Sequence, residues 1–458
     1  MKLNVVILAA GKGTRMRSAL PKVLHSVAGR SLLGHVLDTA KSLAPAKIVT
    51  VYGHGGDIVP KTLAHEPVTW VVQAEQLGTG HAVAQAMPSV EDDTHVLVLY
   101  GDVPLTTQAT LATLLSRAAA NPQTLTLLTA FLEEPKGYGR IVRDGNHKVI
   151  RIVEEKDATE AERGIREINT GILLAKATHL RAWLARLENK NAQGEYYLTD
   201  VIAMAVQDGV VVETTHPAEL GEILGVNDKL QLADIERRFQ ARVAQQLMRD
   251  GVTLRDPARL DVRGKLTVGR DVVIDVNVIF EGTVELADGV QIGANSIIKD
   301  ASLGAGVIVK SHCVIDGAKI GASAVIGPFA RVRPETVLAE EVHIGNFVEV
   351  KKATVNAGAK INHLSYVGDA IIGKRVNIGA GTITCNYDGA NKHLTVIGDD
   401  AFIGSDTQLV APVEIGAGAT IGAGSTITRN APADQLTLSR VPQASKPSWK
   451  RPAKKPKA

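Results

Sequence analysis

Glycines and basic residues are concentrated in one short segment near the beginning of the chain. The segment LAAGKGTRM, residues 8–16, follows a short apolar run, and Pro21-Lys22 comes soon after it. Gly11 and Gly13 would let backbone N–H groups approach phosphate, while Arg15 and Lys22 could neutralise its charge. The spacing fits neither G-x-G-x-x-G nor the Walker loop. The segment therefore predicts a phosphate-binding site of another kind.

A carboxylate stands at the end of an apolar run further along the chain. Tyr100-Gly101-Asp102 closes the run that begins at Val96. An aspartate after a strand is often only a helix cap. Here the adjacent glycine and the upstream phosphate segment favour a functional role.

These segments resemble the sugar-1-phosphate nucleotidyltransferases, whose signature is L-x-x-G-x-G-T-x-M followed by P-K. Gln73 and the segment QLGTGHA, residues 76–82, resemble the base-reading and turn segment of that family. The resemblance implies that Asp102 shares Mg²⁺ with Asn227, and oxygen ligands suit this ion. The nucleotide and sugar contacts that it implies are Leu8, Ala9, Ala10, Gly11, Lys22, Gln73, Gly78, Thr79, Tyr100, Gly101, Asp102, Gly139, Glu154, Asn169 and Asn227.

The chemistry that this resemblance implies is an in-line displacement. A phosphate oxygen of N-acetylglucosamine 1-phosphate attacks the α-phosphorus of UTP and expels pyrophosphate. No protein nucleophile is required. Catalysis would consist of positioning and of charge neutralisation by Mg²⁺, Arg15 and Lys22.

A second set of candidate residues lies in the C-terminal half. The segments FARVRP (329–334), GNFVEVKK (345–352) and HLSY (363–366) resemble the acetyltransferase half of the bacterial bifunctional N-acetylglucosamine-1-phosphate uridyltransferase/glucosamine-1-phosphate N-acetyltransferase family. The resemblance thus covers nearly the whole chain. Ser365 stands where threonine is frequent in that family, and it keeps the hydroxyl.

Acetylation of the amine of glucosamine 1-phosphate by acetyl-CoA needs a base, and a neutral histidine suits this task near pH 7. His363 is the candidate, whereas His312, His343 and His393 are expected to be packing or surface residues. The substrate contacts that the resemblance implies are Arg333, Lys351, Tyr366 and Asn377, the first two on the sugar phosphate. Its acetyl-CoA contacts are Ala380, Asn386, Tyr387, Ser405, Ala423 and Arg440. Whether Ser405 contacts the thiolate or the oxyanion stays open.

Two different patterns of apolar residues divide the chain. Up to about residue 226, short β-branched runs alternate with amphipathic stretches, which predicts βαβ units and a parallel sheet with ligands at the carboxyl ends of its strands. The runs expected to form buried strands are 5–8, 48–52, 68–72 and 96–100. Residues 228–249 repeat apolar side chains every three or four positions, which predicts a helix that ends at Asp250-Gly251.

Beyond residue 251 an aliphatic residue recurs at every sixth position. The run Ile397, Ile403, Leu409, Ile415, Ile421 and Ile427 shows this period. A hexad predicts a left-handed parallel β-helix, because a flat sheet would alternate with a period of two. The phase breaks at 328–340 and 384–395, and the second segment is expected to form an extruded functional loop.

The expected domains are therefore a Rossmann-like uridyltransferase over 1–227, a linker helix over 228–250 and a β-helix acetyltransferase with a basic tail over 251–458. The tail holds Lys446, Lys450, Arg451, Lys454, Lys455 and Lys457 without an acid. The resemblance implies that this tail covers the acetyl-CoA of a neighbouring subunit in a homotrimer. It also implies a role in supplying precursors for peptidoglycan and lipopolysaccharide.

Composition limits the class of protein. The chain of 458 residues is too long for one core and has globular proportions, with 45% hydrophobic and 22% charged residues. Two cysteines, Cys313 and Cys385, do not make a disulfide framework. The beginning of the chain shows neither a signal peptide nor a membrane span. A cytoplasmic enzyme without nucleic-acid or membrane partners is expected.

Three other interpretations remain open at this stage. A regulatory subunit of a translation-initiation exchange factor could share both domain types, although Gly11, Arg15, Lys22, Asp102 and Asn227 form a complete catalytic set. A zinc enzyme could use His312, His343 and His363 across subunits. An adenylyl or guanylyl transferase for another sugar could carry the β-helix as a purely structural domain.

Overall fold

The computed structural model describes residues 1–454, so Lys455 and Lys457 of the expected basic tail lie outside the described residues. The chain divides into two compact units, Met1–Ala241 and Arg242–Ala458. None of the helices that the structure describes has the length and apolar character needed to span a membrane.

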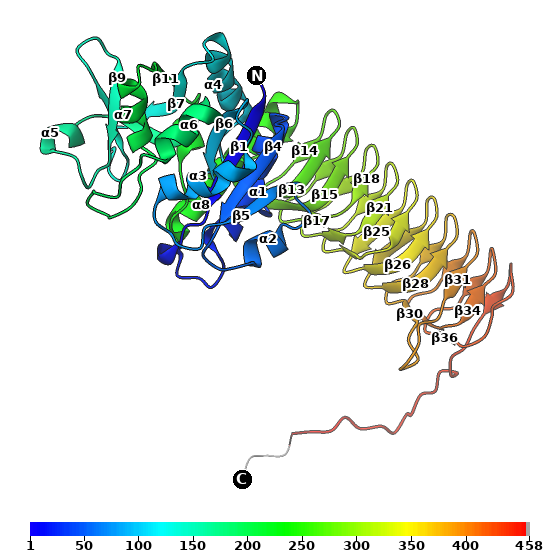
Figure 1. Ribbon diagram of the computed structural model, residues 1–458. Coiled ribbons are helices and arrows are strands. Elements are labelled where there is room, and N and C mark those ends of the chain that lie inside the picture. The colour runs from blue at the N-terminus through cyan, green and yellow to red at the C-terminus, as the bar shows by residue number, and fades with distance from the viewer. Residues whose placement is uncertain (455–458) are drawn as a thin grey trace. The chain divides into compact units, whose positions relative to one another are not determined.

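The N-terminal unit is built on a mixed sheet of order β11-β7-β10-β6-β1-β4-β5 (Figure 1). Strands β5, β4, β1 and β6 run parallel, and β10 is antiparallel to both β6 and β7. The strands are β1 Leu3–Ala9, β4 Lys47–Tyr52, β5 Thr69–Val72, β6 His95–Tyr100, β7 Leu125–Phe131, β10 Glu167–Lys176 and β11 Val212–Thr215, with β2 Ser26–Val27 and β3 Arg30–Ser31 as a hairpin, and β8 Arg140–Arg143 and β9 Val149–Val153 beside β10. The four predicted runs all lie in the parallel part of this sheet, and those of β1, β4 and β6 are largely buried. The prediction of a buried strand over 68–72 was wrong, because β5 is the edge strand of the sheet and Val72 is 51% exposed.

Helices cover both faces of the sheet because successive side chains of its central strands point in opposite directions. Val5 and Ile7 of β1 pack in a core with residues of α1 and α4, whereas Val6 and Leu8 pack in a second core with residues of α3, α6 and α7. The helices are α1 Leu32–Ser42, α2 Ile58–Thr62, α3 Thr79–Ala86, α4 Gln108–Ala120, α5 Glu160–Arg163, α6 Ala177–Leu184 and α7 Asp200–Gln207, with short 3₁₀ turns at Thr14–Met16, Lys22–Leu24, Met87–Ser89 and Leu220–Ile223. Another 3₁₀ turn, Pro257–Arg259, lies in the C-terminal unit. The predicted doubly covered α/β sheet is confirmed.

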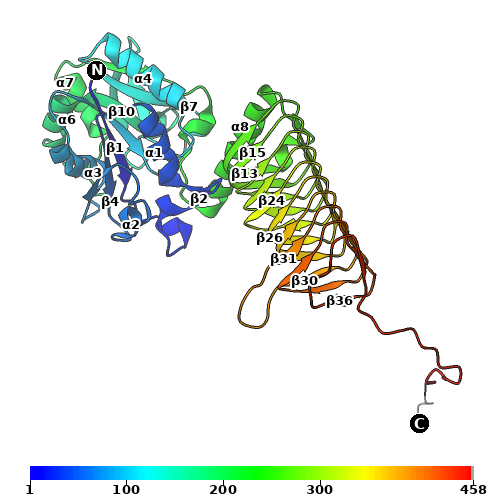
Figure 2. The ribbon, with the colours of Figure 1, turned by 90° about the vertical axis from the view of Figure 1, so that its right-hand side faces the viewer.

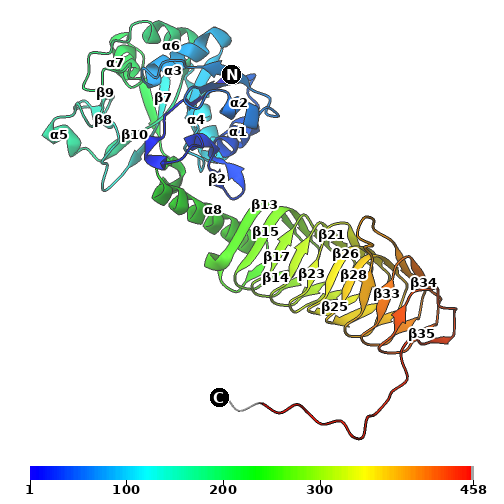
Figure 3. The same cartoon turned by 90° about the horizontal axis from the view of Figure 1, so that it is seen from below.

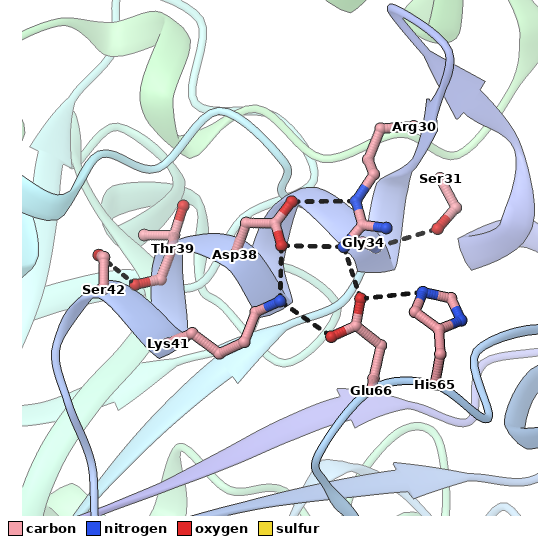
Figure 4. Close-up of polar contacts among 9 residues, drawn as sticks. All are labelled: Arg30, Ser31, Gly34, Asp38, Thr39, Lys41, Ser42, His65 and Glu66. Carbon is pink, nitrogen blue, oxygen red and sulfur yellow. Dashed lines mark hydrogen bonds and ion pairs between the residues drawn. The ribbon is translucent and has the colours of Figure 1, made fainter. Parts of the chain in front are cut away.

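A buried carboxylate fixes the connection between α2 and β5 (Figure 4). Glu66 has a side chain only 3% exposed and accepts from Arg30 Nη2 at 2.6 Å and from Lys41 Nζ at 2.9 Å. Arg30 also pairs with Asp38 at 2.8 and 2.9 Å. The network therefore joins α1, the β2–β3 hairpin and the segment that follows α2.

The predicted helix over 228–249 is α8, Lys229–Arg249. Ile235 in its first half belongs to a small core of the N-terminal unit, together with Met16 and Val226. Ala244 and Leu247 in its second half belong to the core of the C-terminal unit. The helix ends at Arg249, and Gly251 in the turn that follows has a φ of +96° and donates to the carbonyl of Met248.

The C-terminal unit is a parallel β-helix whose coils are stacked in register (Figure 3). Ile274, Ile292, Val309 and Ile326 pair in sequence along one column and are all buried. One column of strands is β12 Thr253–Leu254, β14 Val273–Ile274, β16 Gln291–Ile292, β19 Ile308–Val309, β22 Val325–Ile326, β25 His343–Asn346, β27 Lys360–His363, β29 Asn377–Ile378, β32 Phe402–Ile403, β35 Thr420–Ile421 and β37 Leu436–Thr437. The hexad thus places one buried aliphatic side chain inside the prism from each strand between β14 and β35 of this column, as predicted, whereas Leu436 of β37 is 64% exposed.

The remaining strands belong to a second sheet that continues around the corners of the coils. They are β13 Leu260–Val268, β15 Val278–Leu286, β17 Ile297–Lys299, β18 Ser302–Leu303, β20 Val314–Asp316, β21 Ala318–Ile320, β23 Arg331–Val332, β24 Thr336–Leu338, β26 Glu349–Val355, β28 Tyr366–Ile372, β30 Ile383–Cys385, β31 Thr395–Ile397, β33 Gln408–Val410, β34 Val413–Ile415 and β36 Thr426–Ile427. Between β30 and β31, residues 386–394 leave the coil as a loop, as predicted (Figure 2).

Candidate functional sites

The carboxyl ends of β1 and β6 place the first set of predicted residues side by side. Leu8 pairs with Tyr100 in the parallel register, so the glycine segment after β1 and Asp102 after β6 emerge at one edge of the sheet. A cavity of about 420 Å³ opens there. The predicted nucleotide contacts that line it are Leu8, Ala9, Ala10, Gly11, Lys22, Gln73, Gly78, Thr79, Tyr100 and Asp102, with Gln76 and Glu195 as further lining residues.

The backbone of the glycine segment is shaped to bring Lys22 into this cavity. Gly13 has a φ of +59°, and a Cβ there would lie 2.7 Å from Cβ of Lys22. A side chain at position 13 would therefore displace the lysine. Arg15, the other predicted cation, is exposed in the turn Thr14–Met16 and does not line the cavity.

Lys22 and Asp102 line the cavity, and Lys22 also contacts Asn227, although the three residues lie far apart in the sequence. The Lys22 ammonium forms an ion pair with Asp102 and donates to Asn227 Oδ1 at 3.2 Å. The Lys22 and Asp102 side chains are 11% and 19% exposed. The peptide N–H of Val226 donates to the carbonyl of Asp102 at 2.9 Å, which holds the beginning of α8 against the end of β6.

This arrangement fits a divalent cation. The ammonium shows that the carboxylate and amide oxygens can hold a positive charge between them. Among residues 1–454 no group of three His, Cys, Asp or Glu side chains is placed to bind a metal. Two protein oxygens are a sparse set, which suits Mg²⁺ because this ion takes its other ligands from water and substrate phosphate.

The predicted sugar-binding residues lie together beyond Tyr100. A Cβ on Gly139 would lie 3.5 Å from both carboxylate oxygens of Glu154, and the N–H of Asn169 donates to the carbonyl of Gly139 at 2.9 Å. Glu154 accepts from the Thr199 hydroxyl at 3.0 Å, and burial raises the pKa of its carboxyl. Burial also raises the pKa of the Tyr100 hydroxyl.

His363 in the β-helix has a defined orientation. It pairs with Asn346 in the adjacent coil, and its Nδ1 lies 2.9 Å from Asn346 Oδ1. An amide oxygen only accepts, so Nδ1 carries the proton and Nε2 keeps its lone pair. The imidazole is exposed and is therefore available as a base. Asn346 lies in the segment GNFVEVKK, but the sequence does not predict it as a site residue.

The two residues predicted to bind the sugar phosphate, Arg333 and Lys351, occupy equivalent positions of neighbouring coils. Arg333 donates its N–H to the carbonyl of Val350, the residue before Lys351, so the two cations follow one another along the stack. Arg333 Nη1 also pairs with Glu349 Oε1 at 2.7 Å, and Glu349 in turn is in register with Tyr366. The sequence offered no signal for Glu349 beyond its motif.

The predicted acetyl-CoA residues follow His363 along one corner of the β-helix. Backbone hydrogen bonds run from Gly381 to His363, from Asp406 to Ala380 and from Gly424 to Ser405, and Arg440 donates to the carbonyl of Ala423 at 2.7 Å. The positions in this row are His363, Ala380, Ser405, Ala423 and Arg440. With about 4.8 Å between coils, the row is about 19 Å long, which suits an extended thioester cofactor.

The remaining predicted residues lie beside this row. Asn377 begins β29, and Ala380 follows the end of this strand. Asn386 is 5% exposed at the base of the loop, and Tyr387 is 57% exposed within it. Lys392 lies over the Tyr387 ring at 4.4 Å. His312 stacks on Phe329, with ring centroids 4.7 Å apart, as expected of a packing residue.

Three family models match parts of the chain. The MobA-like NTP transferase domain matches residues 5–193, the GMPPB C-terminal domain matches 262–357 and 322–409, and the bacterial transferase hexapeptide with six repeats matches 394–429. Solved structures of a Methanothermobacter nucleotidyl transferase and of UDP-glucose pyrophosphorylase complexed with UDP-glucose cover 52% and 53% of this chain and 97% and 100% of their own. They are 19% and 14% identical, and their TM-scores of 0.38 and 0.44 are too low to add to the assignment.

Curated relatives match along the whole chain. Proteins named "Bifunctional protein GlmU" from Nitrosospira multiformis and Cupriavidus pinatubonensis are each 60% identical, over 100% and 99% of this chain and 99% and 100% of their own length. A protein of the same name from Methylococcus capsulatus is 58% identical over 99% of this chain and 98% of its own. The chain therefore belongs to the GlmU family of bifunctional enzymes, with a nucleotidyltransferase domain and a hexapeptide-repeat acetyltransferase domain.

Proposed function

We propose that the chain acetylates glucosamine 1-phosphate with acetyl-CoA in the β-helix and transfers UMP from UTP to N-acetylglucosamine 1-phosphate in the N-terminal unit. The products of the second reaction are UDP-N-acetylglucosamine and pyrophosphate. The observation that carries the proposal is the contact of Lys22 with both Asp102 and Asn227, where Lys22 and Asp102 line the nucleotide-sized cavity. A regulatory subunit would have no use for this set of charges.

In uridyl transfer the protein positions the two substrates and neutralises their charge. Gln73, Gly78 and Thr79 line the part of the cavity that would hold the uracil base. Glu154 and Asn169 would bind the N-acetylhexosamine. Lys22 would contact the phosphates of UTP, and Arg15 would reach the same phosphates from its exposed turn.

Asp102 and Asn227 would hold Mg²⁺. When bound, this ion would supply charge neutralisation at the reacting phosphates. Binding would require Lys22 to leave the two oxygens, since the ammonium contacts both of them. The lysine would then be free to turn towards the substrate.

In acetyl transfer, Nε2 of His363 would take the proton from the sugar amine as the nitrogen attacks the thioester carbon. The C–S bond then breaks, and coenzyme A leaves as the thiolate. Asn346 would hold the proton on Nδ1 and so keep Nε2 available. Arg333 and Lys351 would bind the sugar phosphate, and Ser405 would donate to the developing oxyanion or to the thiolate.

Assembly and cellular role extend this proposal. The β-helix would assemble as a homotrimer in the cytoplasm, with the basic tail of one subunit over the acetyl-CoA of the next. Val441 and Trp449 in this tail are 89% and 66% exposed in the single chain, which leaves them available for such a contact. The product would serve peptidoglycan and lipopolysaccharide synthesis.

The test uses purified full-length protein with glucosamine 1-phosphate, acetyl-CoA, UTP and Mg²⁺, and it follows thiol and pyrophosphate release separately. Both products are expected. Pyrophosphate should depend on glucosamine 1-phosphate and acetyl-CoA, unless N-acetylglucosamine 1-phosphate is supplied directly. If ATP or GTP replaced UTP with equal efficiency, the assignment of the nucleotide would be wrong.

A further inference from the structure

One corner of the β-helix contains a buried carboxylate, Asp369, that has no role in the proposed reactions. Asp369 lies on β28 and is 8% exposed, with a φ of +47°. Asp300 and Lys352 occupy the same corner of earlier coils with φ values of +45° and +47°, and both are exposed. The corner geometry alone therefore does not require Asp369 to be buried.

The side chain of Asn386 covers this carboxylate. Asn386 Nδ2 donates to Asp369 Oδ2, and the same nitrogen lies 3.5 Å from the Tyr366 hydroxyl oxygen. A carboxylate only accepts, so the NH₂ group of Asn386 must face Asp369. No donor to Asn386 Oδ1 is found among the described residues, which leaves this oxygen free to accept from a ligand.

The contact between Tyr366 and Asn386 requires a glycine at position 368. A Cβ on Gly368 would lie 2.3 Å from the Tyr366 hydroxyl oxygen and 2.9 Å from Asn386 Nδ2, so any larger residue would separate the two. Thr384, 1% exposed, accepts from the N–H of Gly368 at 2.8 Å and donates to its carbonyl at 3.0 Å. The position of Gly368 is therefore fixed from below.

We propose that Asp369 is a positioning residue of the acetyl-transfer site. It orients the Asn386 amide so that Oδ1 faces the acetyl-CoA row and Nδ2 directs the Tyr366 hydroxyl to donate its proton to the sugar. Burying a carboxylate with an amide as its hydrogen-bond donor costs free energy, and preorganisation of two ligand contacts is the compensating gain. This inference rests on the proposed acetyl transfer and adds a residue that would not itself contact a substrate.

The test compares Asp369→Asn with Asn386→Ala and with the double variant, each as the full chain. Asp369→Asn keeps the shape and loses the charge that fixes the amide. We expect kcat/KM for acetyl transfer to fall about tenfold to a hundredfold, because misplaced ligand contacts cost this much. The double variant should lose no more than Asn386→Ala alone, because Asp369 acts only through Asn386.

The chain supplies its own controls. Uridyl transfer on the same preparations reports whether the N-terminal unit is folded, and it should stay unchanged. The thermal melting of the whole chain by circular dichroism reports whether the β-helix is folded. Asp300→Asn changes the equivalent corner where the carboxylate is exposed, and it should leave both activities unchanged. Asp369→Glu, which keeps the charge, should recover part of the acetyl transfer if Asp369→Asn proves poorly folded.

The outcomes separate this inference from the proposed function. If the losses of Asp369→Asn and Asn386→Ala added in the double variant, Asp369 would have a structural role and the inference would be overturned. Normal acetyl transfer in Asp369→Asn would overturn it as well. If Asn386→Ala kept full acetyl transfer, the proposed contact of Asn386 would be wrong and the inference would fall with it. If thiol release were absent from the unmodified protein, the proposed function itself would fail.

Discussion

Replacing Glu66 with glutamine should destabilise the N-terminal unit by about 2–3 kcal/mol. Removing one partner of a buried ion pair costs about 3–5 kcal/mol when the remaining charge is left unpaired. We expect the smaller loss of about 2–3 kcal/mol here because Arg30 and Lys41 are 32% and 35% exposed and both keep Asp38 as a partner. For a unit of this size the loss corresponds to a fall in Tm of about 5–10 °C.

Tryptophan fluorescence reports this unfolding directly. Trp70 on β5 lies four positions after Glu66 in the sequence and packs edge-on against Tyr52, with ring centroids 6.2 Å apart. Trp183 is 2% exposed in the core. Asp38→Asn is the matched control, because its side chain is 49% exposed and should contribute less than about 1 kcal/mol. Equal losses from both variants would refute the role assigned to the burial of Glu66.

The difference in stability between the wild type and Glu66→Gln should depend on pH. Burial would raise the pKa of Glu66, but hydrogen bonds and charge from Lys41 and Arg30 outweigh it and hold the pKa below its usual value of 4.5. The ionised group therefore stabilises the fold above pH 4.5, and this contribution is lost as the pH falls through the lowered pKa. The difference in Tm between the wild type and Glu66→Gln should be constant near neutrality and should shrink below pH 4.5. A difference that grew on acidification would contradict this sign.

The two proposed sites give three further predictions. His363→Ala should lower acetyl transfer by about a hundredfold or more and leave uridyl transfer unchanged, whereas unchanged thiol release would exclude His363 as the base. Asn346→Ala should lower kcat for acetyl transfer about tenfold and alter its pH profile, because Nδ1 loses the acceptor that fixes the tautomer; an unaltered profile would refute this. Lys22→Met should bind Mn²⁺ about tenfold more tightly without nucleotide, measured by electron paramagnetic resonance of the free ion, because no ammonium competes for Asp102. Weaker binding in Lys22→Met would instead show that the lysine assists the metal.

Much of the fold follows from local patterns. The hexad at Ile397 to Ile427 predicts a coil because each six-residue step returns a side chain to the interior, and neighbouring coils then stack without further information. The apolar runs of β1 and β6 predict parallel strands whose carboxyl ends share an edge of the sheet, whereas the register of Leu8 with Tyr100 is known only from the structure. These features depend on residues close in the sequence or on repeats of one unit.

The features that escaped prediction depend on packing between distant segments. Asp369 occupies a corner that is exposed elsewhere, and its burial depends on how the loop at Asn386 returns to the coil. The pairing of Lys22 with Asp102 and the orientation of His363 by Asn346 depend on side-chain rotamers. Residue type and spacing alone do not contain this information, although family resemblance supplied most of the residues concerned.

The attachment of α8 to the β-helix has a consequence for the way in which this unit unfolds. Ala244 and Leu247 close the apolar interior at the N-terminal end, whereas no helix follows the last coil within residues 1–454. Each coil is hydrogen-bonded only to its neighbours, so fraying starts at an end and moves inwards one coil at a time. The coils that carry Ser405 and Ala423 are close to the unprotected end. Amide exchange should therefore be faster around these two residues than around Arg333. A ligand bound along the acetyl-CoA row would contact several coils at once and should slow this exchange.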